Sequence, residues 1–175
     1  MARRPLVPVR NAASIRRTAG RKTPRSITLI VCEGETERAY FQAVRAHYGL
    51  GNAEVIVAEG NDSAPINVVE HAQHRCAEPG GYDKVFCVFD RDAHESFQRA
   101  CDRVRTLATR TRNPLPIDTA VSIPCFELWL LLHFERTDAP FHRCEDVAPR
   151  LRQWVPNYVK ADAETLRPCL ERLPT

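Results

Sequence analysis

Four short apolar runs alternate with segments of helical periodicity, and this alternation limits the folds that are open to the chain. The apolar runs are rich in β-branched residues and predict buried strands at residues 27–32, 53–58, 84–89 and 119–123. Helices are predicted at residues 36–48, 65–77, 94–111 and 125–134, with weaker ones at 146–154 and 163–173. Strands that alternate with helices form a parallel sheet with helices on both faces. The predicted fold class is therefore α/β.

Charge divides the chain into two parts. Residues 1–25 carry eight arginines and lysines and no acid, so a total net charge of +3 leaves −5 for the remainder. We predict a basic, disordered arm at residues 1–25 and one α/β domain with C-terminal helices at 26–175. A basic arm before an acidic body is typical of contact with nucleic acid or an acidic partner. A solvated leader without a binding role is the alternative, because the arm has no aromatic residue to stack on bases.

The composition also bears on the compartment. No apolar run approaches the roughly 18 residues that a membrane span needs, and the N-terminus lacks the apolar segment of a secretory signal. The seven cysteines form no C-x-x-C pair and no zinc-like spacing. Cys32, Cys87 and Cys125 lie in apolar surroundings and are predicted to be small core residues. We expect a cytoplasmic protein without a membrane partner.

Acidic side chains follow two of the predicted strands. Glu33 and Glu37 come after the strand at 27–32, and Asp90 and Asp92 come after the strand at 84–89. The carboxyl ends of parallel strands meet at one edge of a sheet, where ligands bind. Acids gathered there repel one another and resist desolvation, and a hard cation such as Mg²⁺ or Mn²⁺ among their oxygens relieves both costs. The two clusters predict a metal site that serves chemistry on phosphate esters.

Each acidic pair also has a simpler interpretation. Gly34 permits a sharp turn after Glu33, and Glu37 is then either a site residue or the glutamate of a capping box. Asp90 and Asp92 are two residues apart and share one face of an extended strand, although aspartate is also common in turns. The occurrence of two such clusters, each after a strand, favours the metal site.

A third element is the apolar segment at residues 122–134. A helix that is apolar nearly all round is buried, which leaves Glu127 either at the metal site or at an exposed first helical turn. Ser122 closes the fourth predicted strand and is expected to reach the same site. A buried carboxylate requires a cation or a hydrogen-bond network, so we include Glu127 among the candidate ligands.

Cations and helix ends near these acids are candidates for phosphate contact. Arg91 lies between the two aspartates and either pairs with a neighbour or contacts phosphate. Lys160 follows a proline-containing loop and is either a phosphate contact or a solvated lysine. Thr36 is predicted to cap the helix at 36–48, whose first backbone N–H groups could also receive a phosphate.

The motifs resemble those of a known family. The segments IVCEGETE (30–37), FDRD (89–92) and SIPCFELWLLLHFE (122–135) resemble the RloB-like family, a group of Toprim-related proteins, over residues 27–160. Toprim domains pair a glutamate after the first strand with D-x-D after the third, which corresponds to Glu33, Asp90 and Asp92. The Toprim nucleases of the OLD family carry E-G-x-x-E and a serine and a glutamate after the fourth strand. These positions correspond to Glu33, Glu37, Ser122 and Glu127.

The resemblance implies a Toprim-like parallel sheet and a Mg²⁺-dependent phosphodiester enzyme. One ion would be held by Glu33, Asp90 and Asp92, and a second by Glu37 and Glu127 with Ser122. Ala120 replaces the carboxylate that usually accompanies this serine, so the number of ions stays open. The resemblance also implies a role in prokaryotic anti-phage defence, DNA or RNA as substrate, and an RloA-type ATPase as partner. Family members often run longer, so the chain is expected to be cut at its C-terminus.

Three classes of function follow from these residues. The first is a metal-dependent nuclease, in which the carboxylates are catalytic. The second is an enzyme that makes or breaks a small nucleotide at the same site. The third is a regulatory subunit of an ATPase complex, in which the acids hold an ion without catalysis.

Overall fold

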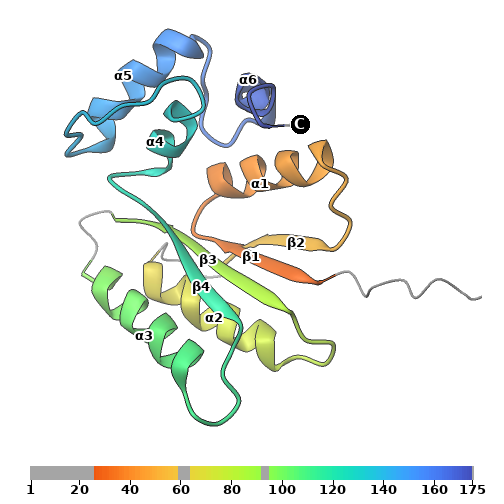
Figure 1. The fold of residues 1–175 in the computed structure, drawn as a ribbon. Coiled ribbons are helices and arrows are strands. Elements are labelled where there is room, and N and C mark those ends of the chain that lie inside the picture. The colour runs from red at the N-terminus through yellow and green to blue at the C-terminus, as the bar shows by residue number, and fades with distance from the viewer. Residues whose placement is uncertain (1–25, 59–63, 92–94, 175) are drawn as a thin grey trace, which may run out of the picture.

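The computed structural model describes residues 26–58, 64–91 and 95–174. In this part of the chain four parallel strands form one sheet in the order β2-β1-β3-β4 (Figure 1). They are β1 (Thr28–Cys32), β2 (Ala53–Val57), β3 (Lys84–Asp90) and β4 (Ile117–Ser122). The helices alternate with the strands along the chain, which confirms the predicted α/β class.

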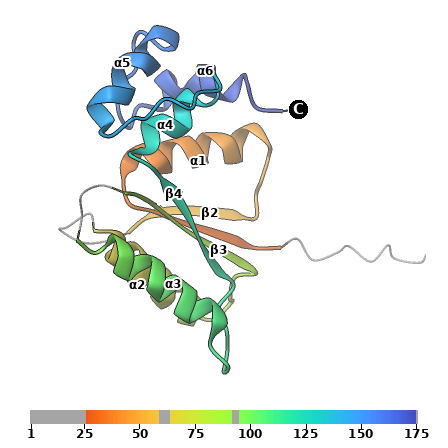
Figure 2. The same cartoon turned by 60° about the vertical axis from the view of Figure 1, so that its left-hand side comes forward.

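Helices cover both faces of the sheet (Figures 1 and 2). Helices α2 (Pro65–Ala77) and α3 (Phe97–Thr109) lie on one face, and α1 (Glu35–His47) lies on the other. The C-terminal elements continue on the side of α1: α4 (Phe126–Leu131), α5 (Cys144–Trp154), η1 (Ala163–Leu166) and α6 (Arg167–Leu170). The sheet is thus sandwiched between two helical layers, one of which is extended by the C-terminal segment.

The alternation of side chains along each strand produces two separate cores. Leu29, Val31 and Phe89 belong to the core beneath α2 and α3. Cys32 and Val88 belong to the core shared with α1, α4 and α5. Strands buried on both faces are apolar at most positions, which is why the four runs were recognisable in the sequence.

The segment after β4 differs from its predicted form. Pro124 is joined to Ile123 by a cis peptide bond and precedes the helix instead of opening it. Helix α4 is short, because after Leu131 the backbone continues in i→i−3 turns such as the one from Phe134 N–H to Leu131 C=O. The helix is also not buried all round, since Trp129 is 48% exposed. Its other face packs into the core with α5.

Several other boundaries also differ from the predictions. β4 begins at Ile117, two residues before its predicted start, and α3 begins at Phe97 instead of residue 94. The helix predicted at 163–173 is the short pair η1 and α6. The predicted arm at residues 1–25 lies outside the described residues. Within the described part of the chain, no helix combines the length and the apolar character that crossing a membrane requires.

Candidate acidic site at the carboxyl edge of the sheet

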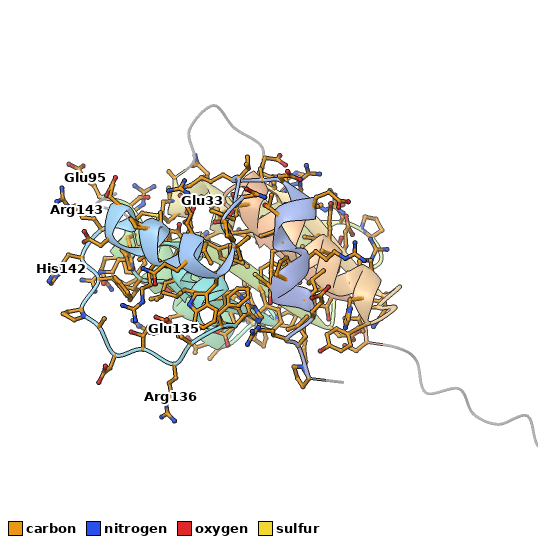
Figure 3. The ribbon with its side chains drawn as sticks, turned by 90° about the horizontal axis from the view of Figure 1, so that it is seen from above. Glu33, Glu95, Glu135, Arg136, His142 and Arg143 are labelled. Atoms are coloured by element: carbon orange, nitrogen blue, oxygen red, sulfur yellow. A yellow bond between two sulfur atoms is a disulfide. The ribbon has the colours of Figure 1, made fainter. Side chains whose placement is uncertain are left out.

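Glu33 and Asp90 meet where β1 and β3 end. The backbone N–H of Asp90 donates a hydrogen bond of 2.9 Å to Oε2 of Glu33. The carboxylate of Asp90 in turn accepts a hydrogen bond of 3.2 Å from the backbone N–H of Phe126, the first residue of α4. The two acids therefore connect the ends of neighbouring strands with the start of the helix that follows β4. Figure 3 shows Glu33 from above, on the side of the molecule that carries α5 and α6.

Glu37 is buried at the first turn of α1, with 6% of its surface exposed. Its carboxylate lies against Gly34, where an added Cβ atom would be only 2.9 Å from Oε2 of Glu37. The chain bends at Glu33 and Gly34 as predicted, but Gly34 has φ −134°, which any residue adopts, so the bend itself does not require glycine. Gly34 provides space for the Glu37 carboxylate, which is buried and also receives hydrogen bonds from the backbone of Gly34 and Glu37 at the start of α1.

Glu127 is also buried, with 2% of its surface exposed. The ammonium Nζ of Lys160 lies 2.9 Å from Oε1 of Glu127, and the hydroxyl of Tyr158 donates a 3.3 Å hydrogen bond to the same oxygen. The prediction that the first turn of this apolar helix buries a carboxylate is confirmed. The cation that accompanies the carboxylate comes from a segment more than 30 residues further along the chain.

A hydrogen bond between distant segments holds Lys160 in place. The backbone N–H of Ala161 donates a 3.2 Å hydrogen bond to Oγ1 of Thr36 in the first turn of α1. Ala161 has φ +63°, the left-handed conformation that reverses the chain after Lys160. The predicted capping role of Thr36 is wrong, because Gly34 occupies the N-cap position of α1 and the Thr36 hydroxyl receives the Lys160 loop.

The charges of three carboxylates act on Lys160. Burial acts to lower its pKa, but the hydrogen bond and charge of Glu127, followed by the charges of Asp90 and Glu37, raise it overall. The pKa of Glu37 is raised, mainly by burial, and the nearby charge of Glu127 adds to the shift while Lys160 opposes it. The ammonium therefore pairs with Glu127 of α4 and also experiences the charges of Asp90 on β3 and Glu37 on α1.

The raised pKa of Glu37 leads to a prediction for the metal-free protein. At a pH between the ordinary pKa of glutamate and this raised pKa, Glu37 keeps its proton in the folded chain and has lost it in the unfolded chain. The free energy of unfolding of the parent therefore increases as the pH falls through this range. We expect Glu37→Gln to be more stable than the parent near neutral pH, with a difference that shrinks on acidification. Urea unfolding from pH 4 to pH 8 in the presence of chelator measures this difference.

The exposed Glu35 in the same helical turn provides the matched control. Glu35→Gln controls for the loss of one carboxylate from this helical turn, because the Glu35 side chain is exposed and paired with Arg38. A constant difference between Glu37→Gln and the parent at every pH would contradict the assignment of Glu37 as a buried acid.

Two other predicted residues lie at the same edge. Ser122 pairs with Asp90 in the register of β3 and β4, so the two side chains share one face of the sheet. Arg91 donates its backbone N–H to the carbonyl of Ser122 at 2.8 Å, and its guanidinium lies 5.8 Å from the centre of the Phe97 ring. Arg91 thus contacts a neighbour on α3. Asp92 lies outside the described residues, so its predicted role as a ligand stays a prediction.

A second cluster lies on the other side of Glu127. Cys125 and Cys144 form a disulfide that links the residue before α4 to the first residue of α5. Cys125 is buried as predicted, but it also forms this disulfide, which the sequence did not predict. Among the described residues, the group of three His, Cys, Asp or Glu ligand atoms within 4.8 Å of one another is Cys125, Glu127 and Cys144. This potential metal-binding triad could not be predicted from spacing, because its cysteines are 19 residues apart.

The fold and these residues define an α/β protein with an acidic site at the carboxyl edge of a parallel sheet. The sequence model of the RloB-like protein family matches residues 28–170. The match spans most of the chain, and the protein therefore belongs to the RloB-like family. No curated protein and no solved structure matches it.

Proposed function

We propose that the chain is a metal-dependent nuclease that hydrolyses phosphodiester bonds of DNA or RNA at the carboxyl edge of the sheet. The observation that carries the proposal is the series of contacts that joins Glu33 to Asp90, Asp90 to the start of α4, and Glu127 of α4 to Lys160. Acids that lie close together repel one another, which destabilises the folded state unless a cation lies among them. Clusters of this kind are typical of functional sites that bind a cation.

The donor set fits Mg²⁺ or Mn²⁺. Glu33, Glu37, Asp90 and Glu127 offer carboxylate oxygens, and Ser122 offers a hydroxyl, all of which are hard ligands that suit these ions. The burial of Glu37 and Glu127 also fits, since a divalent ion would offset the cost of desolvating them. A bound ion would supply Lewis acidity and stabilise the charge that develops on the phosphoryl oxygens.

The protein's own groups have separate tasks in this proposal. The Phe126 N–H orients the carboxylate of Asp90, and the Asp90 N–H orients that of Glu33. Tyr158 fixes the position of Glu127. Lys160 is 68% exposed at its side chain, so its ammonium is accessible to a phosphate of the substrate. We further propose, from the family resemblance, that this activity serves anti-phage defence together with an RloA-type ATPase.

Turnover of labelled single- and double-stranded DNA, RNA and mononucleotides with Mg²⁺ and with Mn²⁺ tests this function. We expect cleavage of a polynucleotide that depends on the metal and stops with chelator. Conversion of mononucleotides alone would replace the nuclease with a nucleotide-handling enzyme. Metal binding without turnover of any of these substrates would favour a regulatory subunit.

A further inference from the structure

The two oxygens of the Glu127 carboxylate face different neighbours. Oε1 contacts Lys160 and Tyr158 at the acidic site, whereas Oε2 lies 3.1 Å from Sγ of Cys144. The sulfur of a disulfide has no proton to donate, so this contact becomes a hydrogen bond only when Cys144 is a free thiol. The structure thus places an oxygen of a buried carboxylate next to the sulfur of Cys144. Their contact is favourable only when this cysteine is reduced.

We infer that reduction of the Cys125–Cys144 disulfide creates a second metal site, formed by both thiolates and Glu127, that binds Zn²⁺. The three ligand atoms already lie within 4.8 Å of one another, and the fourth position of a tetrahedral ion is left to water. Zinc-bound thiolates stand about 3.8 Å apart, given a Zn–S distance of about 2.3 Å. Side-chain rotation can provide this separation, because the two Cα atoms are 5.6 Å apart.

The ligands select the metal. Thiolates are soft ligands that favour zinc over Mg²⁺ and Mn²⁺, so this site differs in chemistry from the proposed acidic site. Two thiolates and one carboxylate carry three negative charges, which Zn²⁺ and the ammonium of Lys160 together neutralise. Cys144 is the first residue of α5, where the helix dipole favours a thiolate.

The disulfide and the metal site exclude each other. An external dithiol reduces the disulfide by donating two electrons and two protons, and it becomes a disulfide itself. Zn²⁺ then binds both sulfurs, and the two thiol protons leave to solvent. Cys144 is only half-buried, and the preceding His142 and Arg143 are exposed at the outer edge of the molecule (Figure 3). A reductant and a metal ion can therefore approach from this side.

Cobalt serves as the spectroscopic probe, because thiolate ligation of Co²⁺ gives a charge-transfer absorption in the near ultraviolet. The full chain is reduced with a dithiol, freed from it under anaerobic conditions and titrated with Co²⁺ and then with Zn²⁺. We expect one Co²⁺ per chain with this absorption in the reduced protein, its displacement by Zn²⁺, and no such absorption in the oxidised protein. No absorption after reduction, or equal absorption before it, would overturn the inference.

Variants assign the ligands. Cys144→Ser keeps only one thiolate and is expected to show at most about half of the absorption and to bind Zn²⁺ at least about 10-fold more weakly than the parent. Glu127→Gln keeps both thiolates and is expected to retain the absorption with weaker affinity. The control is Cys101→Ser, since Cys101 is a free, partly buried cysteine on α3, on the opposite face of the sheet. Equal Zn²⁺ affinity of Cys144→Ser and Cys101→Ser would reject the site.

A second measurement does not depend on the folding of any variant. Zn²⁺ is expected to protect Cys125 and Cys144 of the reduced parent from alkylation, as mapped by mass spectrometry, while Cys76 and Cys101 react as before. Protection of neither residue would count against the site. None of these readouts requires nuclease activity, so the inference and the proposed function can fail independently.

Discussion

Asp90→Asn is expected to lower metal-dependent phosphodiester cleavage by about 100- to 1,000-fold, the usual cost of removing one preorganised charged or polar contact. The substitution keeps an oxygen that can accept the hydrogen bond from the Phe126 N–H, so the start of α4 is preserved. It removes one of the three negative charges that act on Lys160. The free energy of unfolding without metal is expected to stay equal or to rise, because repulsion among the acids decreases.

Initial rates of cleavage at saturating Mg²⁺ measure the loss of activity in Asp90→Asn. Calorimetric titration with Mn²⁺ measures the accompanying loss of metal affinity, which is expected to exceed about tenfold. Asp118→Asn is the matched control, because Asp118 is exposed near the opposite end of β4. Parent-like rates and parent-like Mn²⁺ affinity in Asp90→Asn would remove Asp90 from the site.

Reduction of the Cys125–Cys144 disulfide is expected to lower the free energy of unfolding by about 3 kcal/mol in the presence of chelator. This magnitude follows from the conformational entropy of a closed loop of this size, whose cysteines are 19 residues apart. For a chain of 175 residues it corresponds to a decrease in the melting temperature of roughly 6–12 °C. Thermal melts of the oxidised and the reduced protein measure it.

The variant with Cys125→Ala and Cys144→Ala is the control for other effects of the reductant. It is expected to melt below the oxidised parent and to show no response to reduction, because the remaining described cysteines are free. Identical melting temperatures for the oxidised and reduced parent would show that this disulfide does not contribute to stability. Addition of Zn²⁺ to the reduced parent is expected to restore part of the loss, since an ion that binds only the folded state stabilises it.

The sheet and its helices were accessible from the sequence because their signals are local. β1 and β3 each contain four or more consecutive apolar residues, β2 is apolar except for Glu54, and α2 begins at Pro65 as predicted. The end of the fourth strand and the helix after it were predicted less well. Ile123 and Pro124 form a cis peptide bond there, and helix α4 is partly exposed, neither of which an apolar composition reveals.

The position of the acidic edge was also predictable, since the carboxyl ends of parallel strands must lie together. Glu33 and Asp90 are joined there by a hydrogen bond, and Glu127 is buried on the face of α4 that packs into the core. The parallel direction of the strands brings these residues to the same edge of the sheet. Local sequence therefore determined the fold class and the edge at which the acids gather.

Only the tertiary structure decided which groups accompany these acids. Lys160 reads as a solvated lysine in the sequence, yet the Ala161–Thr36 hydrogen bond brings it to Glu127. Cys125 and Cys144 lack any recognisable spacing, and the packing of α4 against α5 brings them together. Such contacts form when segments that are distant in the sequence pack against one another, and neither periodicity nor residue spacing predicts that packing. The sequence by itself thus determined the parallel sheet and its acidic edge, and the tertiary structure decided the cation and the disulfide that adjoin Glu127.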